Sequence, residues 1–334
     1  MDWDLLSPGW WRAHLPGLMV AALVAVAAQF LSEHYGAPAM LMAILLGIAL
    51  NFLSEEGRTA PGIAFAARGV LRLGVALLGL RISAELFLGL GWPVLALILA
   101  GVVATIGFGL LAAPRFRAAR GFGFLTGGAV AICGASAAMA LAALLPRGEK
   151  GERDLVFAVV GVTILSTLAM IAYPMLAAAL GLDHRLTGVF LGATIHDVAQ
   201  VVGAGFSVSP DTGEVATLVK LIRVALLAPV VLVAALVLRG KAGGDRPPLL
   251  PGFVLGFLAL ATLNSMLVLP HWLTAAAGDI SRAALLMAVA AVGMKTSVAR
   301  LMQVGAGAMA LLLAETAFLA ALVLTGLWVL ETVG

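Results

Sequence analysis

The sequence predicts an all-helical protein that crosses a membrane many times, and three observations support this fold class. The chain of 334 residues is 62% hydrophobic and only 11% charged, more apolar surface than a soluble domain can bury. Apolar runs of about 20 residues, the length of a transmembrane helix, follow one another along nearly the whole chain. Short polar or turn-forming segments separate these runs. We therefore predict a polytopic membrane protein with about eleven transmembrane helices.

Charged residues, glycine and proline bound the predicted spans. The spans cover 16–34, 37–53, 61–82, 93–113, 121–145, 152–180, 184–206, 212–238, 251–270, 277–299 and 301–330. The one long polar linker that we predict is 239–250, which is rich in glycine and proline. Before the first span, Trp10 and Trp11 are typical of a segment that lies at the membrane interface.

Lysine and arginine predict the orientation, because cytoplasmic loops carry the excess of positive charge. We assign to the N-terminal side Arg12, Arg58, Arg115, Arg117, Arg120, Arg185, Arg239, Lys241, Arg246 and Arg300. We assign to the opposite side Arg81, Arg147, Lys150, Arg153 and Arg282. This distribution predicts a cytoplasmic N-terminus and an external C-terminus.

A glycine-rich stretch inside one predicted span favours an interrupted helix. Residues 127–140 read GGAVAICGASAAMA, and glycine allows the backbone to leave helical geometry near Gly134. A second helix that starts at Gly134, Ala135 and Ser136 would direct free N–H groups and a positive dipole end toward the interruption. Such a helix start can bind an anion. The alternative is a continuous helix whose small residues allow close packing.

Short sequence similarities predict an internal repeat. AVAICGASAAMA at 129–140 is similar to AVAAVGMKTSVA at 288–299, which pairs Gly134 with Gly293. Two further similarities keep roughly the same register: VALL at 75–78 and 224–227, and Leu46, Gly47 and Asn51 against Leu191, Gly192 and His196. A repeat with an odd number of spans is inverted in the membrane, and a broken helix in each half is typical of secondary transporters.

The predicted division follows from this repeat. It consists of an N-terminal interfacial segment and extra helix at 1–34, a first five-helix repeat at 35–180, and an inverted second five-helix repeat at 181–334. Two crossing broken helices, one through Gly134 and one through Gly293, would place polar backbone in the middle of the membrane.

Ionisable residues inside the predicted spans require a reason, because a charge at the bilayer centre costs about 2.5–3.5 kcal/mol. His196, Asp197 and Gln200 share part of one helix face, and a histidine beside a carboxylate suits substrate contact or proton coupling. The alternative is a polar cluster that bonds to neighbouring helices. The other candidates within the spans are Arg68, Arg72, Lys220, Arg223, Lys295 and Glu315.

The basic residues among these have two interpretations. Lys220 and Arg223 could face a substrate cavity or pair with Asp197, and Lys295 could meet an anion directly. Each long side chain could instead extend to the membrane interface. For Glu315 we expect a buried pairing with an arginine.

Several segments resemble the YeiH-type family, for which sulfate export has been proposed. They are LRLGVALLGLR at 71–81, AICGASA at 131–137, GATIHDVAQVVGAG at 192–205, KLIRVALLAPVVL at 220–232 and MAVAAVGMKTSVARL at 287–301. The resemblance covers nearly the whole chain and implies a multi-pass protein of the bacterial inner membrane. It also implies a fold similar to that of bile-acid symporters and sodium–proton antiporters, and sulfate or a small organosulfonate as substrate.

These observations predict a secondary transporter that moves a small anion by alternating access. The predicted direction is export, because a dianion gains free energy on leaving a negative-inside cell. The predicted substrate-binding residues are Gly128, Cys133, Gly134, Ala135, Ser136, His196, Gln200, Asn264, Gly293, Lys295 and Thr296. The predicted coupling or charge-compensating residues are His196, Asp197, Arg72, Lys220 and Arg223. We expect the small anion and the lipid bilayer as partners, and no metal, cofactor or nucleic acid.

Two alternatives stay open. The first is a cation–proton antiporter, or anion uptake coupled to a proton or sodium ion, with His196 and Asp197 as the coupling groups. The second is a membrane enzyme that uses Cys133 or His196. We expect no enzyme activity, because no general base is predicted beside the thiol and a buried cysteine usually acts as a small apolar residue. The oligomeric state is also open, with a homodimer as one alternative.

Overall fold

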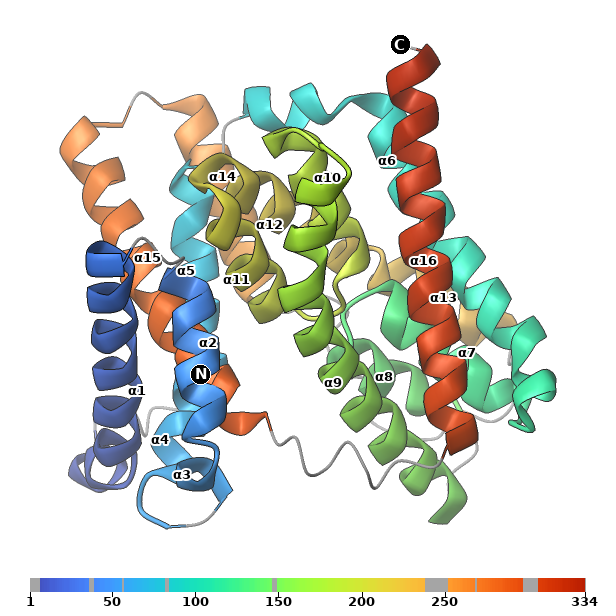
Figure 1. The fold of residues 1–334 in the computed structure, drawn as a ribbon, viewed down its shortest axis with the longest axis horizontal. Coiled ribbons are helices and arrows are strands. Elements are labelled where there is room, and N and C mark those ends of the chain that lie inside the picture. Colours follow the sequence, from blue (N-terminus) through green and yellow to red (C-terminus); the bar gives the residue numbers. More distant parts are fainter. Residues whose placement is uncertain are drawn as a thin grey trace.

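The computed structural model of the chain is built from helices (Figure 1). It describes residues 7–35, 39–55, 57–81, 84–145, 149–237, 252–267, 269–296 and 306–333. Within these residues there is no strand, and 7 helical segments are long and apolar enough to cross a membrane. They are Pro8–Tyr35, Ala60–Leu78, Leu88–Phe116, Glu149–Ala179, Pro210–Val237, Trp272–Lys295 and Gly307–Thr332. The prediction of an all-helical polytopic membrane protein is thus confirmed.

The elements follow the predicted order, with several spans divided into two or three pieces. In chain order they are α1 (Pro8–Tyr35), α2 (Ala39–Ala49), α3 (Phe52–Glu55), α4 (Ala60–Phe65), the π-helix η2 (Ala66–Val70), α5 (Leu71–Leu78), the 3-10 helix η3 (Gly79–Arg81), α6 (Ala84–Ala112), the 3-10 helix η4 (Ala113–Phe116), α7 (Arg120–Ala131), α8 (Ala135–Ala142), α9 (Glu149–Ala179), α10 (His184–Thr194), α11 (Val198–Val208), α12 (Pro210–Ala225), α13 (Leu227–Val237), α14 (Gly252–Met266), α15 (His271–Lys295) and α16 (Ala306–Val333). The predicted linker 239–250 lies outside the described residues.

The helices form two groups that lie side by side (Figure 1). The scaffold group contains α1 to α5, α14 and α15, and the hairpin group contains α6 to α13 and α16. Between the groups, α11 packs against α2 and α15, and α14 touches α6. Each group takes helices from both predicted repeats, 35–180 and 181–334, so the spatial units differ from the predicted repeats. The repeat division itself stays a prediction.

Residues 121–145, predicted as one span, instead form a hairpin of α7 and α8. The two helices run antiparallel, because a Cβ on Gly128 would lie 2.1 Å from Leu141 Cδ1 and one on Gly121 would lie 3.8 Å from Leu145 Cδ2. The chain therefore leaves the hairpin at the end of the molecule where it entered. A run of about 20 apolar residues is long enough either for one crossing or for two short helices that each cover half the membrane, so its length does not distinguish them.

Residues 184–206 form a second hairpin, of α10 and α11, from the opposite end. The hydroxyl of Thr212, at the start of α12, donates to the carbonyl of His184 at the start of α10 at 3.0 Å. A Cβ on Gly205, near the end of α11, would lie 2.8 Å from Gly213 Cα. The start of α10 and the end of α11 are thus both next to the start of α12. This segment, too, was predicted as a single span.

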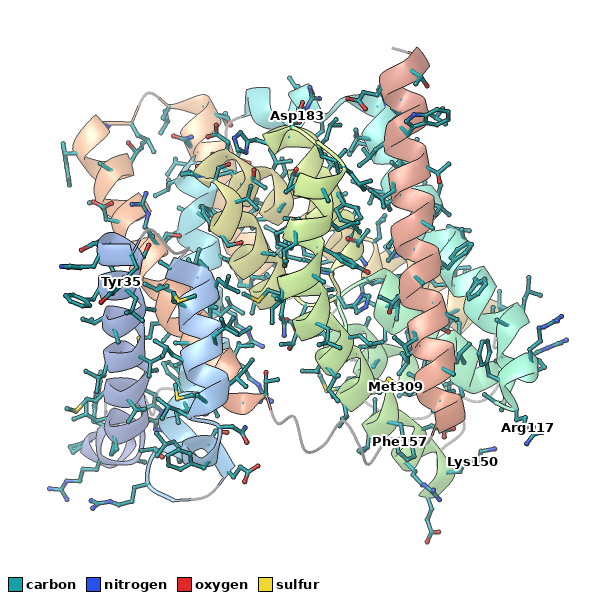
Figure 2. All side chains as sticks on the ribbon, in the orientation of Figure 1. Tyr35, Arg117, Lys150, Phe157, Asp183 and Met309 are labelled. Carbon is teal, nitrogen blue, oxygen red and sulfur yellow. The ribbon has the colours of Figure 1, made fainter. Side chains whose placement is uncertain are left out.

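The hairpins change the assignment of charges to the two ends of the molecule. Arg117 and Lys150 lie at one end, and Asp183 lies at the other (Figure 2). Lys150 and Arg153 therefore belong to the end at which α9 and α16 begin, contrary to our assignment, and Arg185 moves to the opposite end with Asp183. The same lower end of Figure 1 holds α3 and α4, which pack near the start of α1. We call it the N-terminal end. The predicted cytoplasmic N-terminus stays a prediction.

Gly293 itself lies inside the helix α15, although the second interruption is predicted for the stretch 293–297. A Cβ on Gly293 would lie 2.5 Å from Ile44 O and 3.1 Å from Gly47 Cα. The glycine therefore allows α15 to approach the backbone of α2, which is a packing role. The helix ends two residues later, at Lys295, and Ser297 lies outside the described residues.

Candidate functional site

The tips of the two hairpins meet inside the molecule. Between α7 and α8 the chain turns at Ile132, with φ −113° and ψ −85°, and at Gly134, with φ 62° and ψ −125°. A Cβ on Gly134 would lie 3.6 Å from His196 O, in the other tip. The predicted interruption at Gly134 is thus confirmed. Its partner is the tip at 195–197, between α10 and α11, and not Gly293.

We expect Gly134→Ala to destabilise the protein by about 1–3 kcal/mol, because an L-residue is strained at this φ and ψ. The effect should come from the backbone, since no heavy atom outside the neighbouring residues lies closer than 3.6 Å to the added Cβ. Thermal unfolding in detergent measures it. Gly107→Ala, inside α6 with nothing within 4 Å of the added Cβ, is the control and should unfold at or above the wild-type temperature. Equal unfolding temperatures for the two variants would contradict the turn conformation assigned to Gly134.

Two basic side chains of α12 bind the backbone carbonyls at both tips. Lys220 Nζ donates to Ile132 O at 2.6 Å and to Ile195 O at 3.0 Å. The guanidinium of Arg223 donates to Ala131 O at 2.9 Å, Val130 O at 2.8 Å, Gly192 O at 2.9 Å and Ile195 O at 3.0 Å. Both side chains are buried.

These bonds give Lys220 and Arg223 a structural role that sequence reasoning missed. The last carbonyls of a helix have no partner within it, and the C-terminal ends of α7 and α10 meet here in the protein interior. The two cations supply the missing donors and offset the negative ends of both helix dipoles. They do not line the pocket described below, and we call them the clamp. Their described hydrogen bonds are all to backbone carbonyls, so compensation of a substrate's charge by these two residues stays a prediction.

His196 lies at the second tip and is fully buried. Its Nδ1 is 3.2 Å from Val130 O, and its Nε2 is 3.0 Å from Thr316 Oγ1 of α16. These contacts fit a neutral imidazole that donates to the carbonyl and accepts from the hydroxyl. His196 is absent from the described lining of the pocket, so its role as a substrate contact stays a prediction.

Asp197 caps α11 and also reaches the pocket. Its Oδ1 accepts from Ala199 N at 2.9 Å, and its own N–H donates to Ser166 Oγ at 3.0 Å. The carboxyl group thus accepts a hydrogen bond from a free N–H group at the N-terminus of α11. In contrast, α8 begins after Gly134, which has no side chain to cap it, and its first residues, Ala135 and Ser136, line the cavity described below.

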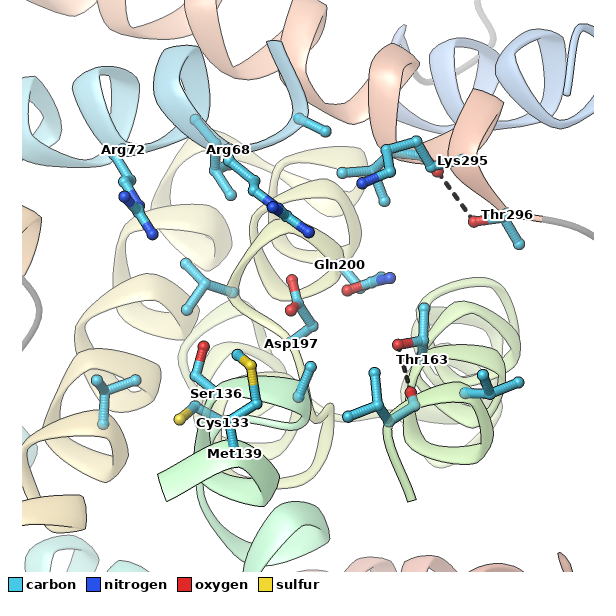
Figure 3. Close-up of a pocket in the computed structure, with 18 of the residues that line it drawn as sticks. Arg68, Arg72, Cys133, Ser136, Met139, Thr163, Asp197, Gln200, Lys295 and Thr296 are labelled. Carbon is cyan, nitrogen blue, oxygen red and sulfur yellow. Dashed lines mark hydrogen bonds between the residues drawn. The ribbon is translucent and has the colours of Figure 1, made fainter. Parts of the chain in front are cut away.

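A cavity of about 510 Å³ lies between the hairpin tips and the scaffold group. This volume suits a small molecule. Figure 3 shows the polar residues of its lining, which come from both groups of helices. They are Arg68, Arg72, Cys133, Ser136, Thr163, Asp197, Gln200, Lys295 and Thr296.

Three cationic side chains enter this cavity from the scaffold group. Arg68 comes from η2, Arg72 from α5 and Lys295 from the end of α15 (Figure 3). Neither guanidinium forms a hydrogen bond or ion pair with another residue that the structure describes. Asp197 is the single carboxylate among the described lining residues. The formal charges therefore leave two net positive charges in the cavity.

The structure brings together about half of the predicted site. Cys133, Ala135, Ser136, Gln200, Lys295, Thr296, Asp197 and Arg72 line the cavity. Other predicted residues are outside its described lining: Gly128, Gly134, His196, Asn264, Gly293, Lys220 and Arg223. Gly128 packs against Leu141, and Asn264 lies in α14. Sequence reasoning left Arg68 out of the site, although its spacing of four residues from Arg72 would place both on one helix face.

Comparisons with known proteins identify the family of this chain. A family model described as "Conserved hypothetical protein 698" matches residues 16–313. The UPF0324 membrane protein TauZ of Paracoccus pantotrophus is 64% identical over 321 residues, which cover 94% of this chain and 95% of that protein. TauZ of Paracoccus denitrificans is 62% identical over 330 residues, with 97% and 98% covered. A UPF0324 membrane protein of Rhizobium meliloti (strain 1021) is 60% identical over 320 residues, with 94% and 93% covered.

No solved structure matches the chain. The match of the family model to most of the sequence, together with three relatives at 60% identity or more, agrees with the resemblance to the YeiH-type family. The chain belongs to the UPF0324 family of membrane proteins.

Proposed function

We propose that the protein is a secondary transporter for a small anion, either sulfate or a small sulfonate. The observation that carries this proposal is the pair of guanidinium groups, Arg68 and Arg72, that enter the cavity beside Lys295 and opposite the uncapped start of α8. Guanidinium groups form paired hydrogen bonds with the oxygens of an oxyanion. A helix N-terminus also favours negative charge. An anion with two charges would neutralise the net formal charge of the cavity.

Transport would follow from movement of the hairpin group against the scaffold group. The cavity lies between the two groups, so such a movement would expose it to each side in turn. Its lining residues on α8, α12 and α15 lie between the hairpin tips and the N-terminal end. Toward the other end, α11 packs against α2 and α15. These positions support a state that is open toward the N-terminal end, which is the predicted cytoplasmic side.

Two similar contacts support an internal repeat. Asn51 Nδ2 donates to Met294 O at 2.7 Å, next to Gly293. His196 lies against Gly134, with its carbonyl oxygen 3.6 Å from the position of a Cβ. The sequence similarities pair Asn51 with His196 and Gly293 with Gly134, so the two contacts lie at nearly corresponding positions. We keep the proposal of one extra helix and two five-segment repeats, with each hairpin counted as one of about eleven segments. Because a hairpin does not cross the membrane, each repeat retains an even number of crossing segments, which does not invert the second repeat.

Export is the direction that the membrane potential favours. Moving one charge across the membrane is worth about 2.3 kcal/mol per 100 mV, and a dianion that leaves a negative-inside cell gains about twice that. Uptake of the same dianion would require at least two accompanying cations. The proposal therefore needs no coupling ion.

Flux of radiolabelled sulfate in proteoliposomes tests the proposal, with a potassium gradient and valinomycin to set the potential. We expect sulfate or a two-carbon sulfonate to leave the vesicles faster when the interior is negative. Protein-free vesicles measure the leak, and Arg117→Gln, which removes an exposed charge at the N-terminal end, is the control variant. Absence of flux in both directions for sulfate and for small sulfonates would reject this substrate class.

Asp197→Asn distinguishes this function from cation–proton antiport or proton-coupled uptake, for which Asp197 in the cavity is the supporting observation. Asparagine keeps the oxygen that accepts from Ala199 N and removes the negative charge. A charge about 8 Å from a dianion contributes about 2–4 kcal/mol at an effective dielectric constant of 20–40. We therefore expect sulfate binding at least about 30-fold tighter, measured by ligand-induced thermal stabilisation. An antiporter would instead lose its pH-dependent cation exchange, with no change in sulfate binding.

A further inference from the structure

Outside the cavity, a carboxyl group of α16 lies between the two hairpins. Glu315 is fully buried, and its Oε1 is 2.8 Å from Thr126 Oγ1 in α7. The next residue, Thr316, contacts His196 of the second hairpin at 3.0 Å. Two consecutive residues of α16 therefore contact one hairpin each.

The carboxyl group has no charged partner in the part of the chain that the structure describes, so the expected pairing with an arginine is wrong there. Its Oε2 is buried without a hydrogen-bond partner. A Cβ on Gly109 of α6 would lie 2.6 Å from its Oε1, which shows that a glycine makes room for the group. An isolated carboxylate is costly to bury, whereas a protonated carboxyl group carries no charge.

The hydrogen bonds of Thr126 allow two arrangements around Glu315. The Thr126 hydroxyl oxygen lies 3.0 Å from Phe122 O, 3.4 Å from Gly123 O and 2.8 Å from Glu315 Oε1. A hydroxyl group has one hydrogen to donate. If Glu315 is ionised, this hydrogen bonds to the carboxylate. If Glu315 is protonated, the carboxyl group can donate to Thr126, and the hydroxyl hydrogen can bond to Phe122 O. The hydrogen-bond partner of the Thr126 hydroxyl therefore depends on whether Glu315 is protonated.

The surrounding elements bring one titratable group near this pair. Helix α16 packs against α6, α7, α9, α10 and η4, and it also contacts the second tip. This group is His196, which contacts Thr316, the residue after Glu315. The charged residues described on those elements lie at their ends: Arg115 on η4, Arg120 on α7, Glu149, Lys150, Arg153 and Asp154 on α9, and His184 and Arg185 on α10.

We propose that Glu315 is a proton-binding site that is linked to the movement of both hairpins. In the arrangement seen here the carboxyl group holds a proton. When α16 and the hairpins rearrange and water reaches the group, it releases that proton to the aqueous phase. This inference goes beyond the proposed function, because binding of a proton by Glu315 does not depend on the identity of the anion. It predicts that transport responds to pH even where no coupling ion is required.

Infrared difference spectroscopy of the purified full-length protein tests the site directly, without substrate. We expect the C=O stretch of a protonated carboxyl group to disappear as the pH is raised, with the loss of one proton per chain, and to be absent from Glu315→Gln. The amide of glutamine imitates the neutral carboxyl group. Glu331→Gln, an exposed position in the same helix, is the matched control and should keep the band.

A titrating band that persists in Glu315→Gln would overturn the proposal, and so would a wild-type band that does not respond to pH while the protein stays folded. Thr126→Val provides a second test should Glu315→Gln fail to fold. It removes the hydroxyl that contacts the carboxyl group and should shift both the band and the pH at which it disappears, and an unchanged band would also count against the site. Failure of sulfate flux affects neither measurement, so the two proposals fail separately.

Discussion

Arg223→Leu is expected to prevent the protein from folding stably. The guanidinium donates to four backbone carbonyls that belong to both hairpins, those of Val130, Ala131, Gly192 and Ile195. Ile195 O keeps Lys220 as a donor and Val130 O keeps His196, whereas Ala131 O and Gly192 O lose their side-chain donor. Each buried carbonyl that loses its donor costs about 1–3 kcal/mol, and the sum of about 2–6 kcal/mol is a large part of the stability of a typical domain, about 5–15 kcal/mol. The yield of monodisperse protein in size-exclusion chromatography and its thermal unfolding measure the effect.

Arg223→Lys should not restore full stability, because an ammonium presents its three N–H groups from one nitrogen, whereas the guanidinium donates to four carbonyls from three nitrogens. Arg117→Leu, which removes an exposed arginine of the same charge, should unfold at nearly the wild-type temperature. If Arg223→Leu behaved like Arg117→Leu, water or other groups would have to satisfy the carbonyls of Ala131 and Gly192. The role of the clamp would then be refuted.

Replacement of both Arg68 and Arg72 by glutamine is expected to weaken sulfate binding by more than about 100-fold. A hydrogen bond to a charged group contributes about 1.5–3 kcal/mol, which is a factor of about 10–150 for each arginine. The fold should survive, because neither guanidinium has a partner among the residues that the structure describes. Sulfate-dependent shifts of the unfolding temperature give the dissociation constant, and sulfate flux gives the rate.

The matched control for this double variant is Arg117→Gln with Lys150→Gln. It removes the same number of charges from the N-terminal end but leaves the cavity intact. Its sulfate affinity should stay within about twofold of the wild type, since exposed charges at this distance are screened by salt. A double variant of Arg68 and Arg72 that binds sulfate as tightly as this control would remove the basis for placing the anion in the cavity.

The glycine pattern predicted one hairpin tip correctly and misplaced the other. Gly134 and Gly293 end similar segments, but one adopts a positive φ and the other allows close packing against α2. Both uses require a residue without a side chain, so sequence similarity cannot separate them. The actual second tip, at 195–197, contains no glycine. Its signal was the polar sequence His196-Asp197 within an apolar run, which we interpreted as the polar face of one continuous helix.

The apolar runs predicted the position of every segment but not whether it crosses the membrane. Hydropathy depends on composition and length, and a hairpin of two short helices has the same composition as one long helix. The contacts that make the hairpins stable come from Lys220 and Arg223, which are distant in the sequence from the first tip. Two charged residues within an apolar span indicated a specific role. Their hydrogen-bond partners, however, are backbone carbonyls, and the sequence does not reveal which ones.

The distance along the chain between the first tip and the clamp has a consequence for biosynthesis. The carbonyls of Val130, Ala131 and Ile132 receive their donors from residues that follow 93, 92 and 88 positions later. At a synthesis rate of about 5–20 residues per second, these donors emerge about 5–18 seconds after the tip. Unpaired carbonyls are not tolerated in hydrocarbon. The nascent segment 120–142 must therefore remain in the translocation channel, or at the lipid headgroups, until the ribosome has completed α12.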